Sequence, residues 1–409
     1  MKIRIIILVL LVLSILSSCV YQKKSAMEEL FSLKMGFNEN ELGILSRDEI
    51  FNNNSINIFY MHGFYYISDS INNKILKTTE KGEPVLIIFN PEFNANIKPT
   101  VTEKDTTSDL VYVKLYKNFP VYSPGLIVSD INKNIYFINK NPSTRITGDD
   151  GTLYEQAVLK FDSKGELLYE IGQNGVSSTP FGYIININID EKNNLVVQED
   201  NEEGILIYKF SEEGNLLKKI QIDRKKIPLL EKEVDLLYDI VDTKLGYFEN
   251  EVYITVQFIK ESQEPLSVAK YETVYEKIYK FSLETMQFDP KILMRVNPQY
   301  TDISKHSSNA ADIKELYGDK QKILKPMETL IGIDNMHNIY FNQKDIVYSK
   351  ADINNELLLI YNSSGGLIKN VSVRYPQDVK YASDMYFSYN GKIFSYYISE
   401  GEIHFVLIN

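Results

Sequence analysis

The chain has 409 residues, of which 24% are charged and 44% hydrophobic, and these fractions are typical of a folded protein rather than a disordered or collagen-like one. There are 44 Lys and Arg against 55 Asp and Glu, which argues against general nucleic-acid binding, because binding to phosphates needs clustered positive charge. A single cysteine excludes an internal disulfide and a zinc site made of several thiolates.

The first residues combine a basic segment with a short apolar one. Lys2 and Arg4 precede the almost purely apolar run Ile5–Leu16. This run is too short to cross a bilayer as a helix, which takes about 20 residues, but it suits the apolar region of a signal peptide. Leu16–Cys19 (LSSC) then resembles a bacterial lipobox, in which small residues precede a cysteine that is diacylated at sulfur. The alternative is a plain signal peptide, or an uncleaved anchor with an incidental cysteine.

The lipobox resemblance implies a division of the chain into a signal peptide (1–18), a lipidated tether (19–28) and a folded domain (29–409). Cleavage before Cys19 would leave this residue at the new N-terminus, where lipid is attached in that class of protein. Two or three acyl chains hold a protein stably on a membrane, whereas one is marginal. We therefore expect attachment to the membrane through Cys19, in the cell envelope, on the periplasmic or surface face of the outer membrane.

Leu30–Phe37 (LFSLKMGF) is the first segment after the tether with an alternating pattern of apolar residues. The alternation predicts a β-strand. A short helix is the alternative, because Ser25–Glu28 is a passable capping box.

Five later segments repeat one pattern: an apolar strand, a polar turn of four or five residues, and a second apolar strand. They are Lys74–Ile88, Val158–Ile171, Ile207–Ile220, Ile278–Ile292 and Leu359–Val371. Four of the five turns contain glycine, namely Gly82, Gly165, Gly214 and Gly365. Glycine relieves strain where the backbone of a tight hairpin takes a positive φ, so the repeats predict hairpins.

A second kind of hairpin precedes three of these segments. Leu126–Ile138, Ile185–Val197 and Leu330–Phe341 each contain an Asp/Asn-rich turn (DINKN, DEKNN and DNMHN), and in the second of them Asn186 and Asn188 alternate with isoleucines. Asp and Asn side chains can cap the backbone of their own turn. A calcium loop would need a spaced ligand set with a glutamate partner, so we interpret these turns as structural.

Period-two strands, frequent turns and a four-stranded repeat predict an all-β protein, a β-propeller. Gly63–Ile88 resembles an NHL-type blade, with a strand ending in Asp, an Asn-rich turn and a strand leading to a hairpin. Similar spacing occurs at Asn134–Gly172 and Ile184–Ile222. Together with the lipobox, the chain resembles six-bladed propeller lipoproteins of spirochaete-like bacteria. The resemblance covers most of residues 56–409 and concerns the fold.

Five blades are expected near residues 56–89, 125–172, 180–222, 237–292 and 329–373. A sixth begins at Asp384 but has room for only three strands before Asn409. An open edge would leave unpaired backbone groups that invite aggregation, so we expect Leu30–Phe37 to supply the missing strand. A seven-bladed ring that uses Val111–Tyr116 is the alternative.

Catalytic chemistry is not apparent in the sequence, which contains no G-x-S-x-G, HExxH or P-loop motif. None of the four histidines, His62, His306, His337 and His404, has a second histidine at ligand spacing. We assign no catalytic residue, no metal site and no cofactor. Tyrosines in the inserts between strands are candidates for a partner surface, because tyrosine is enriched at interfaces. They are Tyr112, Tyr116, Tyr122, Tyr271, Tyr275, Tyr300 and Tyr317.

Three functions remain. The leading hypothesis is a lipid-anchored, non-catalytic scaffold that binds an envelope protein, in a process such as outer-membrane biogenesis. The second is a lactonase- or lyase-type enzyme with a metal in the channel, and the third is a surface receptor for a sugar or small ligand. The side chains that line the central channel would distinguish them.

Overall fold

The protein is described here by a computed structural model, in which the described residues cover most of the chain after residue 22. They are residues 23–24, 27–44, 46–47, 50–51, 55–97, 114–149, 151, 153–246, 250–261, 271–298, 300–302, 322–324, 328–344, 355–388 and 391–409. Within them, no helix is long and apolar enough to cross a membrane.

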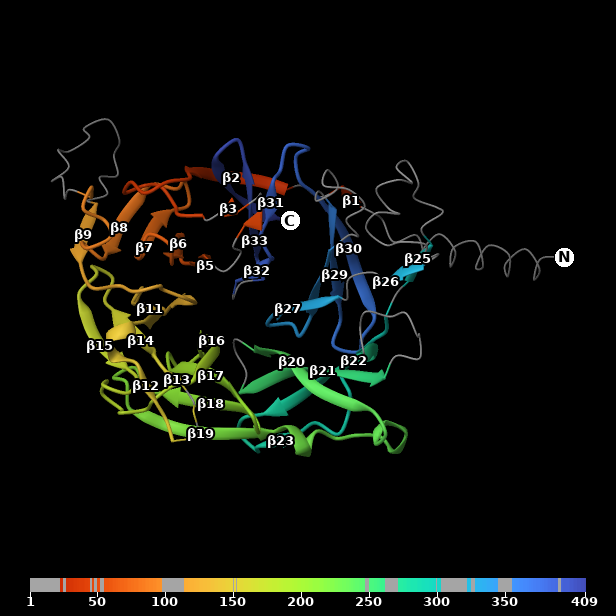
Figure 1. Cartoon of the computed structure of the whole chain (residues 1–409). Coiled ribbons are helices and arrows are strands. Elements are labelled where there is room, and N and C mark those ends of the chain that lie inside the picture. Colours follow the sequence, from red (N-terminus) through yellow and green to blue (C-terminus); the bar gives the residue numbers. More distant parts are fainter. Residues whose placement is uncertain are drawn as a thin grey trace.

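Six small sheets are arranged in a ring (Figure 1), which makes the protein a six-bladed β-propeller. Blade 1 contains β5 (Ile56–Met61), β6 (Phe64–Asp69), β7 (Lys74–Thr79), β8 (Pro84–Phe89) and β9 (Leu115–Asn118). Blade 2 contains β10 (Ile127–Ser129), β11 (Ile135–Lys140), β14 (Gln156–Phe161) and β15 (Leu167–Ile171). Blade 3 contains β16 (Tyr183–Ile189), β17 (Leu195–Asn201), β18 (Gly204–Phe210) and β19 (Leu216–Asp223).

The second half of the ring follows the same order from the axis outward. Blade 4 contains β20 (Leu237–Leu245), β21 (Glu251–Glu261) and β22 (Tyr271–Ser282), with β23 (Gln287–Phe288) and β24 (Met294–Val296) outside them. Blade 5 contains β27 (Thr329–Ile333), β28 (Ile339–Lys344), β29 (Asn355–Tyr361), β30 (Leu367–Arg374) and β1 (Lys23–Lys24). Blade 6 contains β31 (Tyr381–Ala382), β32 (Tyr386–Phe387), β33 (Ile393–Ser399), β34 (Glu402–Ile408) and β2 (Met27–Lys34).

Short elements lie between these strands. Three two-stranded pairs are formed by β3 (Ser46–Arg47) with β4 (Ile50–Phe51), β12 (Ile146–Thr147) with β13 (Leu153–Tyr154), and β25 (Tyr300–Asp302) with β26 (Lys322–Leu324). The 3₁₀ turns are η1 (Pro142–Thr144), η2 (Arg224–Lys226) and η3 (Glu231–Glu233). The all-β prediction is therefore confirmed, and so are the positions of the six expected blades.

The alternative count of seven blades is wrong for the described part of the chain. Leu115–Asn118, at the end of the segment considered for a seventh blade, forms β9 and pairs in parallel with β8. It is a fifth strand of blade 1 rather than the start of another sheet. Residues 111–113 of that segment lie outside the described residues.

The core consists of six apolar clusters, and each cluster fills the space between two neighbouring blades. Alternating strand residues point to opposite faces of a sheet, so a blade with a neighbour on each side must be apolar on both faces. Strand β8 shows this, because its residues Val85–Phe89 are all apolar and all buried. Some strand residues with polar side chains are buried as well, such as Lys77 and Thr78 of β7.

The Asp/Asn-rich turns are structural, as the sequence indicated. Asp130 Oδ1 accepts hydrogen bonds from the backbone N–H groups of Asn132 (2.9 Å) and Asn134 (2.8 Å), and Oδ2 accepts one from the Asn134 amide (2.8 Å). Asp190 and Asp334 hold their turns in the same way. The four expected turn glycines all have φ between 79° and 88°, which a side chain would disfavour.

The ring is closed by the N-terminal strand. Strand β2 pairs antiparallel with β34, from Met27 opposite Ile408 to Lys34 opposite Glu402. The expected closure is confirmed, although the strand covers Met27–Lys34 rather than Leu30–Phe37. The helical alternative is wrong for these residues. β2 is thus the fourth strand of blade 6, and its first residue lies two positions before the expected domain boundary at residue 29.

A loop after β2 fastens this closure to blade 1. The Gly43 N–H donates to Asp69 Oδ2 (2.8 Å), and Lys74 Nζ donates to the carbonyls of Asn38 (2.8 Å) and Glu41. Asp69 and Lys74 are completely buried. Burial lowers the pKa of Lys74 to about 8 and raises that of Asp69 to about 6, so both charges depend on these partners.

Candidate functional site

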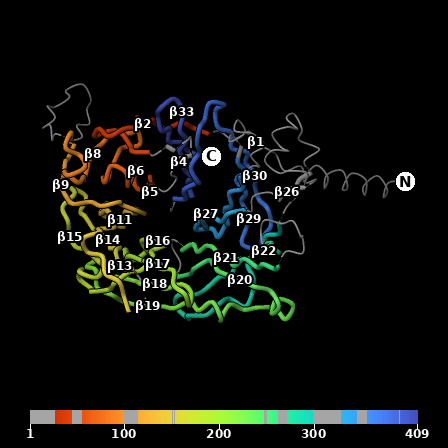
Figure 2. Tube along the Cα trace, in the orientation of Figure 1, coloured from red at the N-terminus to blue at the C-terminus, as the bar shows by residue number. Residues whose placement is uncertain are grey.

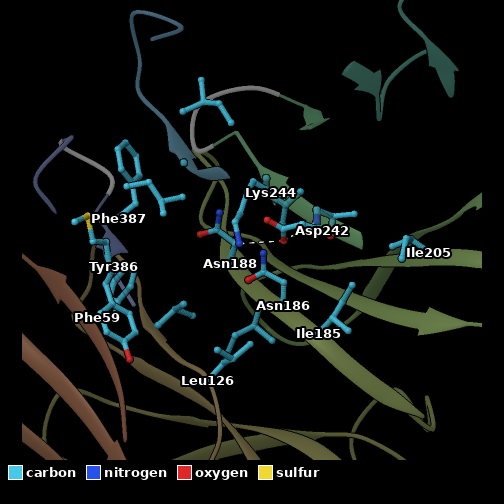
Figure 3. Close-up of a pocket in the computed structure, with 18 of the residues that line it drawn as sticks. Phe59, Leu126, Ile185, Asn186, Asn188, Ile205, Asp242, Lys244, Tyr386 and Phe387 are labelled. Carbon is cyan, nitrogen blue, oxygen red and sulfur yellow. Dashed lines mark hydrogen bonds and ion pairs between the residues drawn. The ribbon is translucent and has the colours of Figure 1, made fainter. Parts of the chain in front are cut away.

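The inner strands of all six blades surround a cavity of about 380 Å³ on the ring axis, shown in Figure 3. Its lining residues come from β5, β10, β16, β20, β27 and β32, from the residues directly beside them, and from Asp200 of β17 and Ile205 of β18. This volume falls in the range of small-molecule sites in proteins, which is about 300–1,000 Å³. The cavity is therefore the first candidate for a functional site.

Three of the inner strands carry a β-bulge at the cavity. The extra residues are Ile185 in β16, Val241 in β20 and Ile331 in β27, and each of them lines the cavity. A bulge places two residues opposite one and shifts the alternation of the residues that follow. In β16, Ile184 is buried before the bulge, whereas Ile187 and Ile189 are buried after it.

The changed alternation turns polar residues toward the axis. Asn186 and Asn188 of β16 face the cavity, as do Asp242 and Lys244 of β20 (Figure 3). Lys244 Nζ lies 3.1 Å from Asp242 Oδ1, which also accepts the Thr243 N–H at 2.8 Å. These four residues form the polar wall of the cavity.

Side chains behind the polar wall are also polar. Thr243 Oγ1 donates to Gln198 Oε1 (3.0 Å), and Gln257 Nε2 donates to Glu276 Oε1 (3.1 Å). Burial, reinforced by the negative charge of Asp242, raises the pKa of Glu276. Among the described residues, Asp242 Oδ2 and Gln198 Nε2 are buried without a hydrogen-bond partner, a situation in which ordered water commonly serves as the partner.

The opposite side of the cavity is aromatic. Phe59 of β5 and Tyr386 and Phe387 of β32 lie across from the polar wall (Figure 3). Gly332 makes room for this arrangement, because a Cβ atom at that position would lie 2.4 Å from Cγ of Phe387. Tyr386 is fixed by a hydrogen bond from its hydroxyl to the carbonyl of Ile56 (3.2 Å). These three residues form the aromatic wall.

The described tyrosines of the expected partner surface lie in blade 1 and its insert, in blade 4 and in strand β25. Tyr116 and Tyr122 belong to the outer part of blade 1 and its insert, where the Tyr116 hydroxyl donates to Glu39 (2.9 Å). Tyr271 begins β22 of blade 4 and is 40% exposed, and Tyr300 begins β25. Tyr112 and Tyr317 lie outside the described residues.

The expectation for Tyr275 is corrected by the structure, in which this side chain is only 4% exposed. Its hydroxyl donates to Glu233 Oε1 (2.7 Å), and the Arg295 guanidinium lies 3.9 Å from the centre of its ring. The residue was counted as part of an insert, but it continues the long strand β22 into the interface with η3.

The three described histidines lie in three different blades. His62 and His337 lie in turns, and Nδ1 of His404 in β34 lies 3.0 Å from Oε1 of Glu29, at hydrogen-bond distance. His306 and Cys19 lie outside the described residues. Within the described ranges, no three His, Cys, Asp or Glu side chains come together as a metal-binding group.

The sequence interpretation missed the polar wall. Its signal was present, because Asn is depleted in strands and yet Asn186 and Asn188 occupy alternate positions of one strand. The polar Asp242 and Lys244 have the same spacing in β20. The two pairs line one wall of the cavity only because the inner strands converge on the axis of the ring and because β-bulges shift the two strands that carry them.

A second candidate site lies on the outer rim. Strands β15 and β19 begin with pairs of exposed apolar residues, Leu167–Leu168 and Leu216–Leu217, of which Leu168 is 50% and Leu217 is 56% exposed. Within the described residues, no further strand pairs with β15 or β19. We call these four residues and their strand edges the rim patch.

Blade 1 provides an internal comparison for the rim patch. The residue at the position of Leu168 and Leu217 is Val85, which is 9% exposed, and there the outer strand β8 is paired with β9. In blade 5, Ile368 occupies the same position and is 53% exposed, and β1 pairs with β30. The outer edges of two blades are thus paired by parallel strands of this chain.

Comparison with known proteins shows that the overall fold resembles that of several solved structures. No family model and no curated protein sequence matches the chain. Among solved structures, it is similar to a member of the DUF4221 family from Bacteroides vulgatus (12% identity, 95% of this chain and 99% of that one covered, TM-score 0.42). It is also similar to a gluconolactonase from Xanthomonas campestris (10% identity, 94% of this chain and 96% of that one covered, TM-score 0.37). A luciferin-regenerating enzyme is similar as well (9% identity, 90% of this chain and 95% of that one covered, TM-score 0.37).

Proposed function

We propose that this chain is a lipid-anchored, non-catalytic scaffold of the bacterial cell envelope that binds a protein partner along the rim patch. The observation that carries the proposal is the exposure of Leu168 and Leu217 beside two unpaired strand edges. Edge strands are normally short, charged or covered, because their free N–H and C=O groups can pair with another chain. Apolar residues beside such an edge favour a binding surface.

The proposed occupant is an extended segment of the partner, added as a parallel strand. Binding of this kind takes its affinity from main-chain hydrogen bonds and its specificity from alternate side chains. The same geometry occurs within this chain, where β9 pairs with β8 from Leu86 opposite Leu115 to Phe89 opposite Asn118. A partner strand on β19 would cover Leu217 as blade 1 covers Val85.

Photocrosslinking tests the rim patch. A photoreactive amino acid at Leu168 or Leu217 of the full-length chain is expected to give an adduct of one mass in intact cells. The same amino acid at Ile368 is the matched control, because that residue has similar exposure and repeat position but lies in a strand that β1 already pairs. Equal adducts at all three positions, or none at Leu168 and Leu217, would contradict the proposal.

We propose that the lipid on Cys19 attaches the ring to the membrane at the outer edge of blade 5, away from the rim patch. Cys19 precedes Lys23 by four residues, and four fully extended residues span at most roughly 14 Å, at about 3.6 Å per residue. Lys23 pairs with Val371 on the outer strand of blade 5. Blade 5 is three blades away from blade 2 and two away from blade 3 in the ring (Figure 1), so a leaflet at blade 5 would leave the rim patch accessible.

Metabolic labelling tests the anchor. Cells given an alkyne-tagged fatty acid are expected to label the wild-type chain, and Cys19→Ser should lose the label completely because no other cysteine is present. Ser18→Ala is the matched control and should retain the label, since it keeps a small residue before the cysteine. Label that persists in Cys19→Ser, or a wild-type chain without label, would refute lipidation at this residue.

A further inference from the structure

We propose that the axial cavity is a second binding site, which takes a neutral, polyhydroxylated ligand of about the size of one sugar ring. This inference goes beyond the scaffold function and does not depend on it, because the cavity lies on the axis and the rim patch at the periphery. The reasons lie in the hydrogen-bonding capacity, the charge and the shape of the two walls.

The polar wall contains side-chain amide atoms that form no hydrogen bond within the described structure. The Asn186 side chain makes no hydrogen bond within the described structure, and for Asn188 only Oδ1 is used, by the Ile189 N–H (2.8 Å). An amide both donates and accepts, which matches a hydroxyl group that also does both. Two such amides at alternate positions of β16 can meet neighbouring hydroxyls of one ligand. An apolar ligand would leave them unpaired, at a cost in free energy.

Each charged side chain that lines the cavity already has a partner of opposite charge. Lys244 is paired with Asp242, and Asp200 accepts a hydrogen bond at 2.8 Å from the Arg224 guanidinium, which also pairs with Asp239. A charged ligand would lose its hydration without finding an uncompensated opposite charge, which is unfavourable. A neutral ligand has no such penalty, so the wall favours hydroxyls over carboxylate or ammonium groups.

The aromatic wall completes the complementarity. Sugar rings have C–H faces that are apolar and edges that carry hydroxyls. The rings of Phe59, Tyr386 and Phe387 offer apolar surface on one side, while the amides of the polar wall lie on the other (Figure 3). Small-molecule sites commonly combine an apolar surface with a few polar groups in this way.

Saturation-transfer NMR and calorimetry with full-length protein in a zwitterionic, sugar-free detergent test this inference. The probes are D-glucose, D-galactose and D-mannose, with gluconate and glucosamine as charged counterparts. At least one neutral sugar is expected to bind at least tenfold more tightly than either charged probe. No signal from any neutral sugar at millimolar concentration, or tighter binding of a charged probe, would overturn the proposal.

Two variants locate the binding. Asn186→Leu should weaken sugar binding by about tenfold, which is the order of magnitude expected for the loss of one hydrogen bond. Asn215→Leu is the control, because Asn215 lies in an exposed turn, and it should leave sugar binding unchanged. Lys244→Met leaves Asp242 without its cation, so the preference should shift toward glucosamine. Denaturation midpoints check that each variant is folded. Sugar binding that is the same in folded Asn186→Leu and wild type would refute the site.

Discussion

Phe31→Ala is expected to reduce the free energy of unfolding by about 3–5 kcal/mol, the usual range for removing a large aromatic side chain from a core. Phe31 is 8% exposed and stacks on Phe405 of blade 6, with ring centres 4.6 Å apart. It also contacts Tyr65 of blade 1 at 5.2 Å. The substitution therefore leaves a cavity at the one interface where the two ends of the chain meet.

The measurement is the urea denaturation midpoint of the full-length chain. Ser32→Ala is the matched control in the same strand, because the Ser32 side chain is exposed and donates one hydrogen bond, to Glu402 (2.7 Å), within the described structure. We expect that control to change stability by less than about 1 kcal/mol. If Phe31→Ala and Ser32→Ala had equally small effects, the strand would not be needed to close the ring.

Lys277→Met is the second substitution with a large expected effect. Lys277 and Glu233 form a fully buried ion pair that attaches η3 to blade 4. Removing one partner of such a pair costs about 3–5 kcal/mol, since it leaves the other charge buried without compensation. The Glu233→Gln/Lys277→Met double variant should be more stable than Lys277→Met alone, because no unpaired charge remains. Both values follow from urea denaturation, and a double variant less stable than the single one would contradict this explanation.

The pH dependence provides an independent test of the same pair. Burial alone would raise the pKa of Glu233, but hydrogen bonds from Lys277, the Leu230 N–H and Tyr275 outweigh it and lower the pKa below its usual 4.5. A lowered carboxyl pKa stabilises the folded state above about pH 4.5, and this stabilisation is lost as the pH falls through the lowered value. The stability difference between wild type and Lys277→Met should therefore be largest near neutral pH and shrink below pH 4.5. A constant difference across this range would exclude the charge of Glu233 as its cause.

The two proposed binding sites use different parts of the same ring (Figure 2). The rim patch belongs to the outermost strands of blades 2 and 3, whereas the polar wall belongs to the innermost strands of blades 3 and 4. Substitutions at Leu217 and Asn186 can therefore be tested separately. A chain with a photoreactive amino acid at Leu217 that still binds sugar, and an Asn186→Leu chain that still forms the Leu217 adduct, would show that the two sites act independently.

Local patterns in the sequence were sufficient for the blades. Alternation of apolar residues, glycines at positive φ and self-capping Asp residues act within a few positions of the chain, so they could be read without a structure. Closure by the N-terminal strand also followed, because a blade with three strands has an edge that must be covered. The bounds of this strand were misplaced by three residues, because its position is set by partners distant in the chain, Ile408 for Met27 and Tyr65 for Phe31.

The cavity and its walls were decided only by the tertiary structure. Asn186 and Asp242 are 56 positions apart, and they face one space because six inner strands converge on an axis and because bulges shift two of those strands. The same holds for Tyr275, whose place in a long strand buries a side chain that looked exposed. Sequence periodicity reports which residues are near in the chain, whereas a binding site depends on residues brought near in space.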